Sequence, residues 1–242
     1  MLSTLKKAVR IAIHPKGGIG YLLSNTRSLS SFYINKNVSA VLPNIGTVLD
    51  VGANIGQFAV AANKFYPNTP IFSFEPVPET FEALKKNTGS FSEITIYNVA
   101  LGDAEGTIEF YQNAHSHASS ALKISEEQKT AIPDTGSYKA INVQLQKLDS
   151  FKFGEKLKKP VLLKLDVQGF EKHVINGGKQ FLKNVDYILI EVSFVRMYDG
   201  EPLFDEIHQL LHELGFAIHS PVGLFTAKDE KILQMDMLYK RV

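Results

Sequence analysis

Residues 48–65 read VLDVGANIGQFAVAANKF, an apolar strand followed by a turn and then an apolar segment at helical spacing. The strand ends on the carboxylate of Asp50, and the backbone opens at Gly52 and Gly56 before the helix begins. A plain connector needs one tight turn, whereas this one keeps a carboxylate and two glycines. We therefore expect the turn to hold a ligand.

The same alternation of strand and helix continues from residue 46 to the end of the chain. It predicts an α/β fold with a mostly parallel sheet covered by helices on both faces. Strands are expected at 47–52, 70–76, 94–102, 160–169, 187–194, 216–221 and 232–242, the last two as antiparallel neighbours. Helices are expected at 57–66, 78–89, 171–184 and 202–215. Added strands are expected at 102–112 and 140–151, with a polar, nonperiodic loop between them.

Residues 1–45 precede this pattern and form a basic lead-in to a domain at 46–242. Six basic residues and no acidic one stand before Asp50. Such an arm could lie over anionic lipid, an anionic substrate or a partner protein. We favour a simpler interpretation, a helix whose apolar side docks on the domain through Leu5, Ala8, Val9 and Ala12. The charge is too sparse to predict nucleic-acid binding.

Composition narrows the classes of protein further. The chain has no cysteine, so it has neither disulfides nor a thiol nucleophile, and this composition fits a reducing compartment. No run approaches 18 apolar residues, and the first residues lack the charge order of a signal peptide. We therefore expect a cytoplasmic protein without a transmembrane segment.

A second carboxylate, Glu75, ends the next predicted strand. In parallel sheets ligands bind beyond the carboxyl ends of the strands, and a carboxylate there can accept hydrogen bonds from both ribose hydroxyls. The turn at 52–56 does not fit the G-x-G-x-x-G register of dinucleotide sites, and Asp50 would repel a pyrophosphate. It would suit a sulfonium or an amino group. S-adenosylmethionine has both, although Gly52 alone could be a turn glycine and Asp50 alone a helix cap.

Four segments together resemble the FkbM family of S-adenosylmethionine-dependent methyltransferases: VLDVGANIGQFAV, FSFEPVPETFEALKKN, VALGDAEGTIEFY and LLKLDVQGFEKHVINGG. The resemblance spans residues 48–194. It implies a Rossmann-like class I methyltransferase fold, with a seven-stranded sheet and an antiparallel last strand. It also implies methyl transfer, usually to a hydroxyl oxygen of a sugar, polysaccharide or polyketide-like acceptor. The cofactor contacts that it implies are Asp50, Gly52, Asn54, Gly56 and Glu75, with Ala100 and Leu101 flanking the adenine.

A hydroxyl acceptor must lose a proton, so a general base or a metal is expected. Asp166, at the end of the strand VLLKLD, is our first candidate, and Lys164 could tune it or pair with another carboxylate. Glu191 lies at the corresponding point of the next strand and could be a base, a structural acceptor, or a Mg²⁺ ligand together with Asp166. His115 and His117 lie on the long loop, where His117 is a third candidate for catalysis.

Other functions stay open at this point. A nitrogen or nucleic-acid methyltransferase is disfavoured because DVQG stands where such enzymes carry an N-P-P-Y-like tetrapeptide. The glycine spacing disfavours a nicotinamide-dependent dehydrogenase, and a non-catalytic cofactor-binding scaffold is the remaining alternative. We expect a small-molecule or glycan acceptor, no nucleic acid, and specificity set by residues 112–140 and the N-terminal arm.

Overall fold

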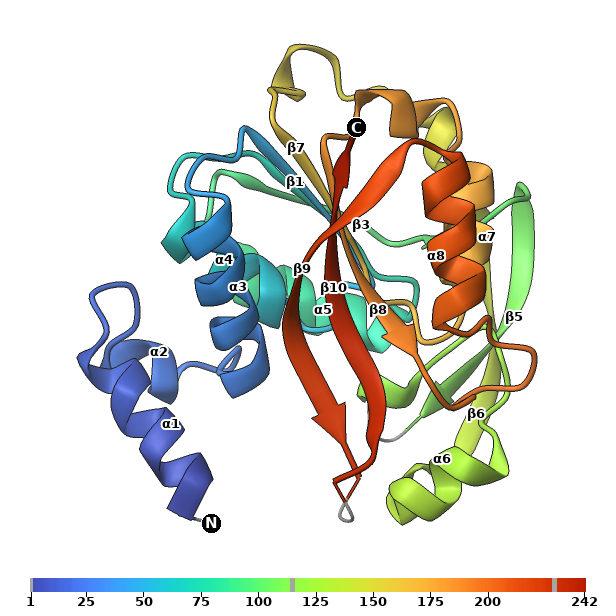
Figure 1. The fold of residues 1–242 in the computed structure, drawn as a ribbon, viewed down its shortest axis with the longest axis horizontal. Helices are drawn as coiled ribbons and strands as arrows, with labels where there is room; N and C mark the ends of the chain where they lie inside the picture. The colour runs from blue at the N-terminus through green and yellow to red at the C-terminus, as the bar shows by residue number, and fades with distance from the viewer. Residues whose placement is uncertain (1, 114–115, 228–229) are drawn as a thin grey trace.

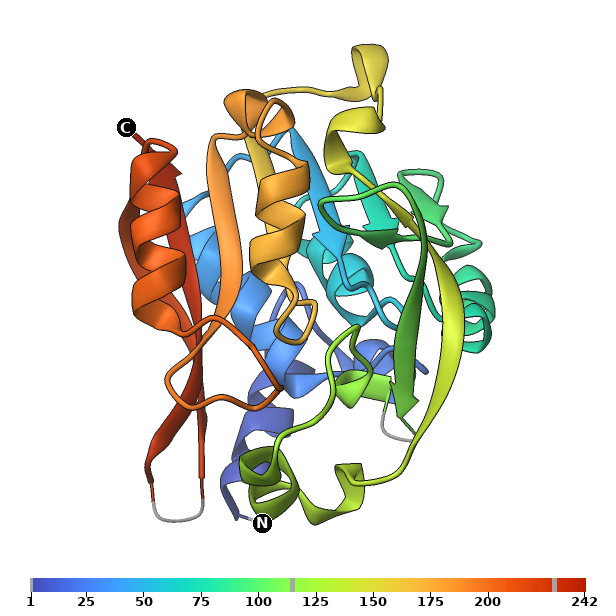
Figure 2. The same ribbon diagram turned by 90° about the vertical axis from the view of Figure 1, so that its right-hand side faces the viewer.

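The computed structural model of the chain describes residues 2–113, 116–227 and 230–242. Its centre is a seven-stranded sheet in the order β3-β2-β1-β7-β8-β10-β9 (Figures 1 and 2). The strands are β1 Thr47–Val51, β2 Ile71–Phe74, β3 Ile94–Tyr97, β7 Val161–Leu165, β8 Tyr187–Ser193, β9 Phe216–Thr226 and β10 Ile232–Arg241. Strands β1, β2, β3, β7 and β8 pair in parallel, and β10 is antiparallel to both β8 and β9. The predicted α/β class and its antiparallel closing strands are confirmed.

Successive residues of the central strands point to opposite faces, and each face has its own apolar core. Val48 and Leu162 belong to a cluster with residues of α3 (Leu29–Val41) and α4 (Gln57–Phe65). Leu49 and Leu163 belong to a cluster with residues of α7 (Glu171–Gly177) and α8 (Phe204–Glu213). Because β1 and β7 are buried on both faces, their sequences are nearly continuous apolar runs.

A smaller sheet of β4 (Ala100–Leu101), β6 (Tyr138–Gln146) and β5 (Gly106–Asn113) lies beside the central one. The two added strands are therefore confirmed. The single strand expected at 94–102 is instead divided between the two sheets. The division falls at Asn98, whose side-chain amide donates to the carbonyl oxygens of Glu75 and Pro76.

Three other predicted elements differ in extent. The helix expected at 171–184 ends at Gly177. The backbone of Gly177 packs so closely on Gly102 that a Cβ at Gly177 would lie 1.7 Å from the carbonyl oxygen of Gly102, so only glycine fits there. Strand β9 continues to Thr226 and forms a long hairpin with β10. The loop between β5 and β6 contains a short helix, α6 (Glu126–Ala131).

The 3₁₀ turns of the described residues are at Ser116–Ala118, Pro133–Thr135, Leu148–Ser150, Gly154–Lys156 and Phe181–Asn184. Helix α5 (Pro78–Thr88) matches its prediction.

The N-terminal segment forms α1 (Leu2–Ile13), α2 (Ile19–Leu23) and α3. Phe32 and Val38 of α3 join the same core as α4. The predicted docking of α1 through Leu5 and Val9 is wrong, because both side chains are exposed. Ile11 is buried instead. A Cβ at Gly17 would lie 2.2 Å from the carbonyl oxygen of Ile11, so the following turn closes tightly on Ile11 and holds that edge of α1 inward.

Among the helices of the described residues, none has the length and apolar character needed to cross a bilayer.

Candidate active site

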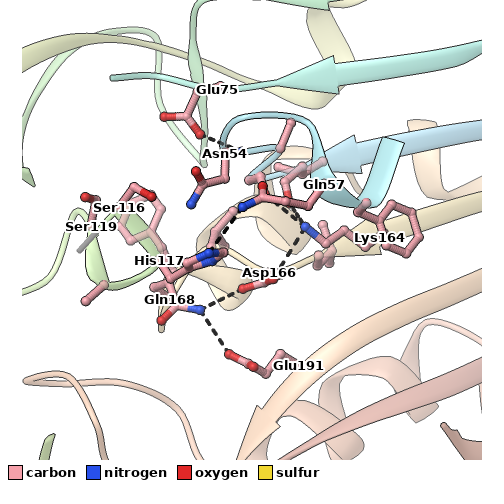
Figure 3. Close-up of a pocket in the computed structure, with 18 of the residues that line it drawn as sticks. Asn54, Gln57, Glu75, Ser116, His117, Ser119, Lys164, Asp166, Gln168 and Glu191 are labelled. Carbon is pink, nitrogen blue, oxygen red and sulfur yellow. Dashed lines mark hydrogen bonds and ion pairs between the residues drawn. The ribbon is translucent and has the colours of Figure 1, made fainter. Parts of the chain in front are cut away.

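A cavity of about 460 Å³ opens at the carboxyl ends of β1, β2, β7 and β8. Most of the predicted site residues line it: Gly52, Asn54, Glu75, Ala100, Leu101, His117, Asp166 and Glu191. Asp50 and Gly56 are not among the residues that line it. Figure 3 shows that the labelled polar side chains come from the β1–α4 turn, the end of β2, the segment after β5, and the ends of β7 and β8.

The turn between β1 and α4 lies directly against the end of β7. Gly52 has φ 78°, and a Cβ there would lie 1.9 Å from the carbonyl oxygen of Asp166. Asn54 (φ 49°) and Gly56 (φ 96°) also adopt left-handed backbone conformations. Glycine and asparagine are the residues that tolerate this region best, which explains the composition of the turn.

Glu75 joins this turn to the end of β2. Its Oε2 accepts a hydrogen bond from the backbone N–H of Asn54 (2.9 Å), and its Oε1 accepts one from that of Val77 (3.0 Å). Each oxygen keeps a further lone pair for a ligand. Burial raises the pKa of Glu75 to about 7, against the opposing effect of these two hydrogen bonds.

An apolar wall adjoins Glu75. Ala100 and Leu101 are buried in β4 and line the cavity together with Phe74 and Val99. This wall is apolar, as the faces of a planar heterocycle require.

Asp50 lies behind the turn, fully buried, with its Oδ1 3.1 Å from Nζ of Lys164. The register places these two residues opposite each other on β1 and β7. The sequence left the role of Lys164 open between tuning Asp166 and pairing with another carboxylate, and the structure has it in both contacts.

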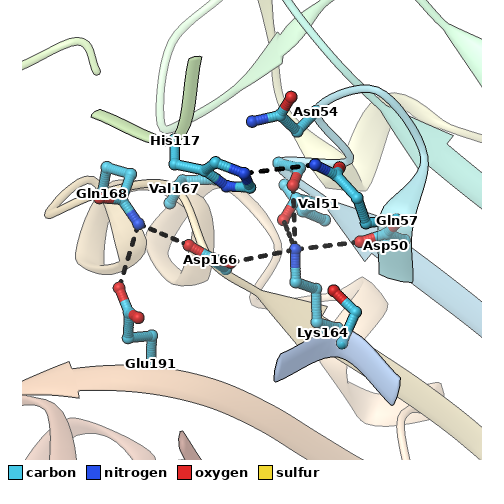
Figure 4. Close-up of polar contacts among 12 residues, drawn as sticks. Asp50, Val51, Asn54, Gln57, His117, Lys164, Asp166, Val167, Gln168 and Glu191 are labelled. Carbon is cyan, nitrogen blue, oxygen red and sulfur yellow. Dashed lines mark hydrogen bonds and ion pairs between the residues drawn. The ribbon is translucent and has the colours of Figure 1, made fainter. Parts of the chain in front are cut away.

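Lys164 is the centre of this polar cluster (Figure 4). Besides Asp50, its ammonium contacts Oδ2 of Asp166 at 3.5 Å and donates to the carbonyl oxygen of Gly52 at 2.9 Å. Burial alone lowers the pKa of Lys164, but the two carboxylates outweigh it and raise the pKa above its ordinary value. The lysine therefore remains a cation between Asp50 and Asp166.

Asp166 is the carboxylate of this cluster that reaches the cavity, with its side chain 38% exposed. Its Oδ1 accepts a hydrogen bond from Nε2 of Gln168 at 2.7 Å. With Lys164 on one oxygen and Gln168 on the other, the plane of the carboxylate is fixed.

Glu191 converges with Asp166, as expected for neighbouring strands. Its Oε2 accepts hydrogen bonds from Nε2 of Gln168 (3.1 Å) and Nε2 of Gln234 (2.9 Å). Asp236 is paired with Glu191 across β8 and β10 and also lines the cavity. Burial and the neighbouring carboxylates raise the pKa of Glu191 well above its ordinary value, and burial raises the pKa of Asp236 to about 7.

His117 reaches the cavity from the 3₁₀ turn after β5. Its Nε2 lies 3.2 Å from Nε2 of Gln57, the first residue of α4. Figure 4 shows the imidazole on the same side of the cluster as Gln168. His115, its partner in the sequence motif, lies outside the described residues.

Within the described residues, no group of three or more histidine, aspartate or glutamate side chains is arranged to hold a metal ion. Between Asp166 and Glu191, the amide nitrogen of Gln168 occupies the bridging position.

Residues 50–218 match the sequence model of the methyltransferase FkbM domain. The chain belongs to the FkbM methyltransferase family. The chain is therefore an S-adenosylmethionine-dependent methyltransferase, and the resemblance inferred from the sequence is confirmed.

Several relatives align with most of the length of this chain. It is 26% identical over 202 residues to the 2-O-methyltransferase NoeI of Sinorhizobium fredii, covering 81% of this chain and 83% of NoeI. It is 26% identical over 194 residues to the 31-O-demethyl-FK506 methyltransferase FkbM of Streptomyces tacrolimicus, covering 71% and 72%. The hexuronic acid methyltransferase AglP of Haloferax volcanii is 27% identical over 144 residues, covering 59% and 54%.

Solved structures support the fold. The magnesium protoporphyrin IX methyltransferase of Synechocystis superposes with a TM-score of 0.52 at 11% identity, covering 99% of this chain and 91% of that one. At this identity, the match bears on the Rossmann-like fold alone.

The sequence did not single out several polar residues that line the cavity, among them Gln57, Gln168, Gln234 and Asp236. Two of them had a detectable signal. Gln234 and Asp236 interrupt the apolar run of the last strand at a spacing of two, which puts both on one face. Gln168 and Gln57 had no comparable signal, because a glutamine in a turn or at a helix start is ordinary.

Proposed function

We propose that this chain methylates a hydroxyl oxygen of a sugar, a glycan or another small natural product, with Asp166 as the general base. The observation that carries the proposal is the position of Asp166. It follows the last residue of β7, faces the cavity, and is fixed on both oxygens by Lys164 and Gln168.

The half of the cavity beside β1 and β2 fits S-adenosylmethionine. The buried carboxylate of Glu75 has lone pairs left for two ribose hydroxyls, and the apolar wall of Ala100 and Leu101 suits the adenine. Gly52 and Asn54 bring backbone close to the place of the methionine part. We assign Asp50 to holding Lys164, and Gly56 to shaping the turn, because neither lines the cavity.

When bound, S-adenosylmethionine supplies a methyl group on a cationic sulfur, which is a good leaving group. The chain must then hold the acceptor hydroxyl in line and accept its proton. Asp166 receives this proton on a carboxylate oxygen, and Lys164 and Gln168 hold the carboxylate in place beforehand. Glu191, whose pKa is raised by burial and by the neighbouring carboxylates, serves as a hydrogen-bonding group. His117, which also lines the cavity, would contact the acceptor.

The other half of the cavity would take the acceptor. Its wall combines apolar and polar side chains, as a sugar ring with hydroxyl edges and apolar faces requires. The residues are Ser30, Ser31, Ile34, Leu224, Phe225, Gln234 and Asp236. The name of one relative, a 2-O-methyltransferase, supports an oxygen acceptor, and the name of another, a hexuronic acid methyltransferase, supports a sugar.

Magnesium has no part in this proposal. A Mg²⁺ ion shared by Asp166 and Glu191 would have to displace the Gln168 amide, which donates to both carboxylates. Turnover should therefore be unchanged by EDTA.

The proposal is tested in two steps. Calorimetry should show saturable binding of S-adenosylmethionine and S-adenosylhomocysteine, with no binding of NAD. Release of S-adenosylhomocysteine is then measured with methyl glycosides of neutral hexoses, deoxyhexoses and hexuronic acids. Asp166→Asn should keep cofactor affinity and lose about 10²- to 10⁴-fold in turnover.

The matched control is Asp205→Asn, which changes an exposed aspartate in the first turn of α8. It should leave both measurements unchanged. Full turnover by Asp166→Asn would overturn the assignment of the base. Methylation of an amine and of none of the hydroxyl acceptors would overturn the acceptor class.

A further inference from the structure

Helices α1 and α2 expose a group of large aliphatic side chains that the fold does not use. The exposed fractions are 65% for Leu5, 52% for Val9, 78% for Ile13, 67% for Ile19 and 76% for Leu23. Single exposed aliphatic residues are common on protein surfaces, but a group of this kind marks an interaction site. We refer to these five residues as the aliphatic patch.

The part of the aliphatic patch on α1 is a continuous stripe. Leu5, Val9 and Ile13 are spaced four residues apart, so they lie one above another along the helix. The helix contacts the rest of the protein by another edge, through buried Ile11 and through the carbonyl oxygen of Lys7, which accepts a hydrogen bond from the hydroxyl of Tyr33. The stripe is therefore surplus to the packing of α1.

Exposed basic side chains belong to the same segment as the aliphatic patch. The exposed bases of residues 1–49 are Lys6, Lys7, Arg10, Lys16, Arg27 and Lys36. Lys6 and Arg10 directly follow Leu5 and Val9 in the sequence and so flank the stripe. No acidic residue occurs in this segment. In the described part of the chain, no ion pair joins these six bases to a carboxylate.

We propose that α1 and α2 bind an anionic lipid surface. A helix with an aliphatic stripe and basic flanks lies in the interface of a membrane, where the aliphatic side chains enter the acyl boundary and the bases meet lipid phosphates. A second copy of the chain fits less well. A symmetric contact would bring two sets of the same basic residues together without an acid between them.

The orientation of α1 relates this surface to the cavity. The N-terminal end of α1, the carboxyl end of β8 and the far end of the β9–β10 hairpin lie toward the same end of the molecule (Figures 1 and 2). Leu224 and Phe225 of that hairpin are exposed and also line the cavity. If the proposed function holds, an acceptor carried by a membrane lipid would be presented at this end. Lipid binding itself rests on α1 and α2 alone.

The test is co-sedimentation of the full chain with vesicles. The protein should bind vesicles of phosphatidylcholine mixed with phosphatidylglycerol, and the bound fraction should fall as salt is raised. It should bind vesicles of pure phosphatidylcholine at least about tenfold less. Equal binding to both vesicles, or binding to neither, would overturn the proposal.

Two variants separate the contributions, and both change only exposed side chains. The triple variant Leu5→Ser, Val9→Ser, Ile13→Ser removes the stripe, and the double variant Lys6→Glu, Arg10→Glu reverses two charges. Each should reduce binding to the anionic vesicles about tenfold or more. Their controls are Val242→Ser, which changes a residue 86% exposed at the opposite end of the molecule, and the double variant Lys152→Glu, Lys240→Glu.

Calorimetry with S-adenosylmethionine keeps the result independent of folding and of the proposed function. All four variants should bind the cofactor like the original chain. If the stripe variant binds vesicles normally, the proposal fails. If light scattering shows a dimer that only the stripe variant loses, the patch belongs to a second copy and the proposal is overturned.

Discussion

The side-chain amide nitrogen of Gln168 lies 2.7 Å from Oδ1 of Asp166, and the same nitrogen lies 3.1 Å from Oε2 of Glu191. The amide oxygen of Gln168 accepts a hydrogen bond from the hydroxyl of Tyr198 at 2.6 Å. Its backbone carbonyl accepts one from the hydroxyl of Ser120, also at 2.6 Å. Gln168 thus joins two strand-end carboxylates to the segment that follows β5, and its left-handed backbone (φ 57°) is held by these contacts.

Replacing Gln168 by leucine should lower kcat about tenfold or more, because Asp166 loses the donor that orients it. Steady-state rates of the original chain and of Gln168→Leu check this. Gln144→Leu, at an exposed position of β6, is the control. An unchanged kcat in Gln168→Leu would contradict the role of Gln168 in orienting Asp166.

Lys164→Met should destabilise the protein by about 3–5 kcal/mol, because Asp50 would be left as a buried charge without its partner. Urea denaturation measures the loss. The double variant Lys164→Met, Asp50→Asn removes that charge and should recover a substantial part of the free energy of unfolding. A double variant no more stable than Lys164→Met alone would mean that the ion pair is not what holds these two strands.

Much of this architecture follows from local sequence. Strands β1 and β7 are apolar runs that end at Asp50 and near Asp166, and the parallel pairing of β7 with β8 brings Glu191 beside Asp166. The adjacency of these strands was predictable because alternating strands and helices produce parallel neighbours. The family resemblance supplied the number of strands and the antiparallel last strand, and it agreed with the cofactor inferred from the turn at 52–56.

What the sequence left open depends on contacts between distant segments. The burial of Asp50 is set by Lys164, which lies opposite it only once β1 and β7 are in register. Asp236 reaches the cavity because an antiparallel strand pairs it with Glu191. The docking edge of α1 follows from a tight turn at Gly17 and not from the amphipathic pattern, which predicts the wrong face.

Affinity for S-adenosylmethionine should depend on pH through Glu75. Its pKa is raised to about 7 in the free protein, mainly by burial, so the carboxyl is largely protonated below that pH. Ribose hydroxyls donate best to the ionised form. Affinity should therefore rise by up to about tenfold per pH unit as pH increases toward 7, and level off above it. Calorimetry between pH 5 and 8 measures this dependence. Burial raises the pKa of Asp236 to about 7 as well, so the contributions of the two carboxyls must be distinguished.

The variant Glu75→Gln distinguishes the effect of Glu75 on the pH dependence from that of Asp236. The amide cannot ionise, so the variant should bind the cofactor more weakly at pH 8 and show a flatter pH dependence. Asp236→Asn should leave the dependence nearly unchanged, because Asp236 lies across the sheet from Glu75 on β10. The assignment is contradicted if Asp236→Asn flattens the curve and Glu75→Gln does not.

The backbone of Gly52 is the least replaceable part of the cofactor turn. A Cβ there would lie 1.9 Å from the carbonyl oxygen of Asp166, and its φ of 78° already disfavours any side chain. Gly52→Ala should therefore separate the ends of β1 and β7, lower the melting temperature and weaken binding of S-adenosylmethionine at least about tenfold. Gly200→Ala is the matched control, because Gly200 has φ 77° with no atom within 4 Å of its Cβ position. It carries the same backbone cost, about 1–2 kcal/mol, without the contact. If the two variants lost stability and affinity equally, the close approach of β1 to Asp166 would have no part in forming the site.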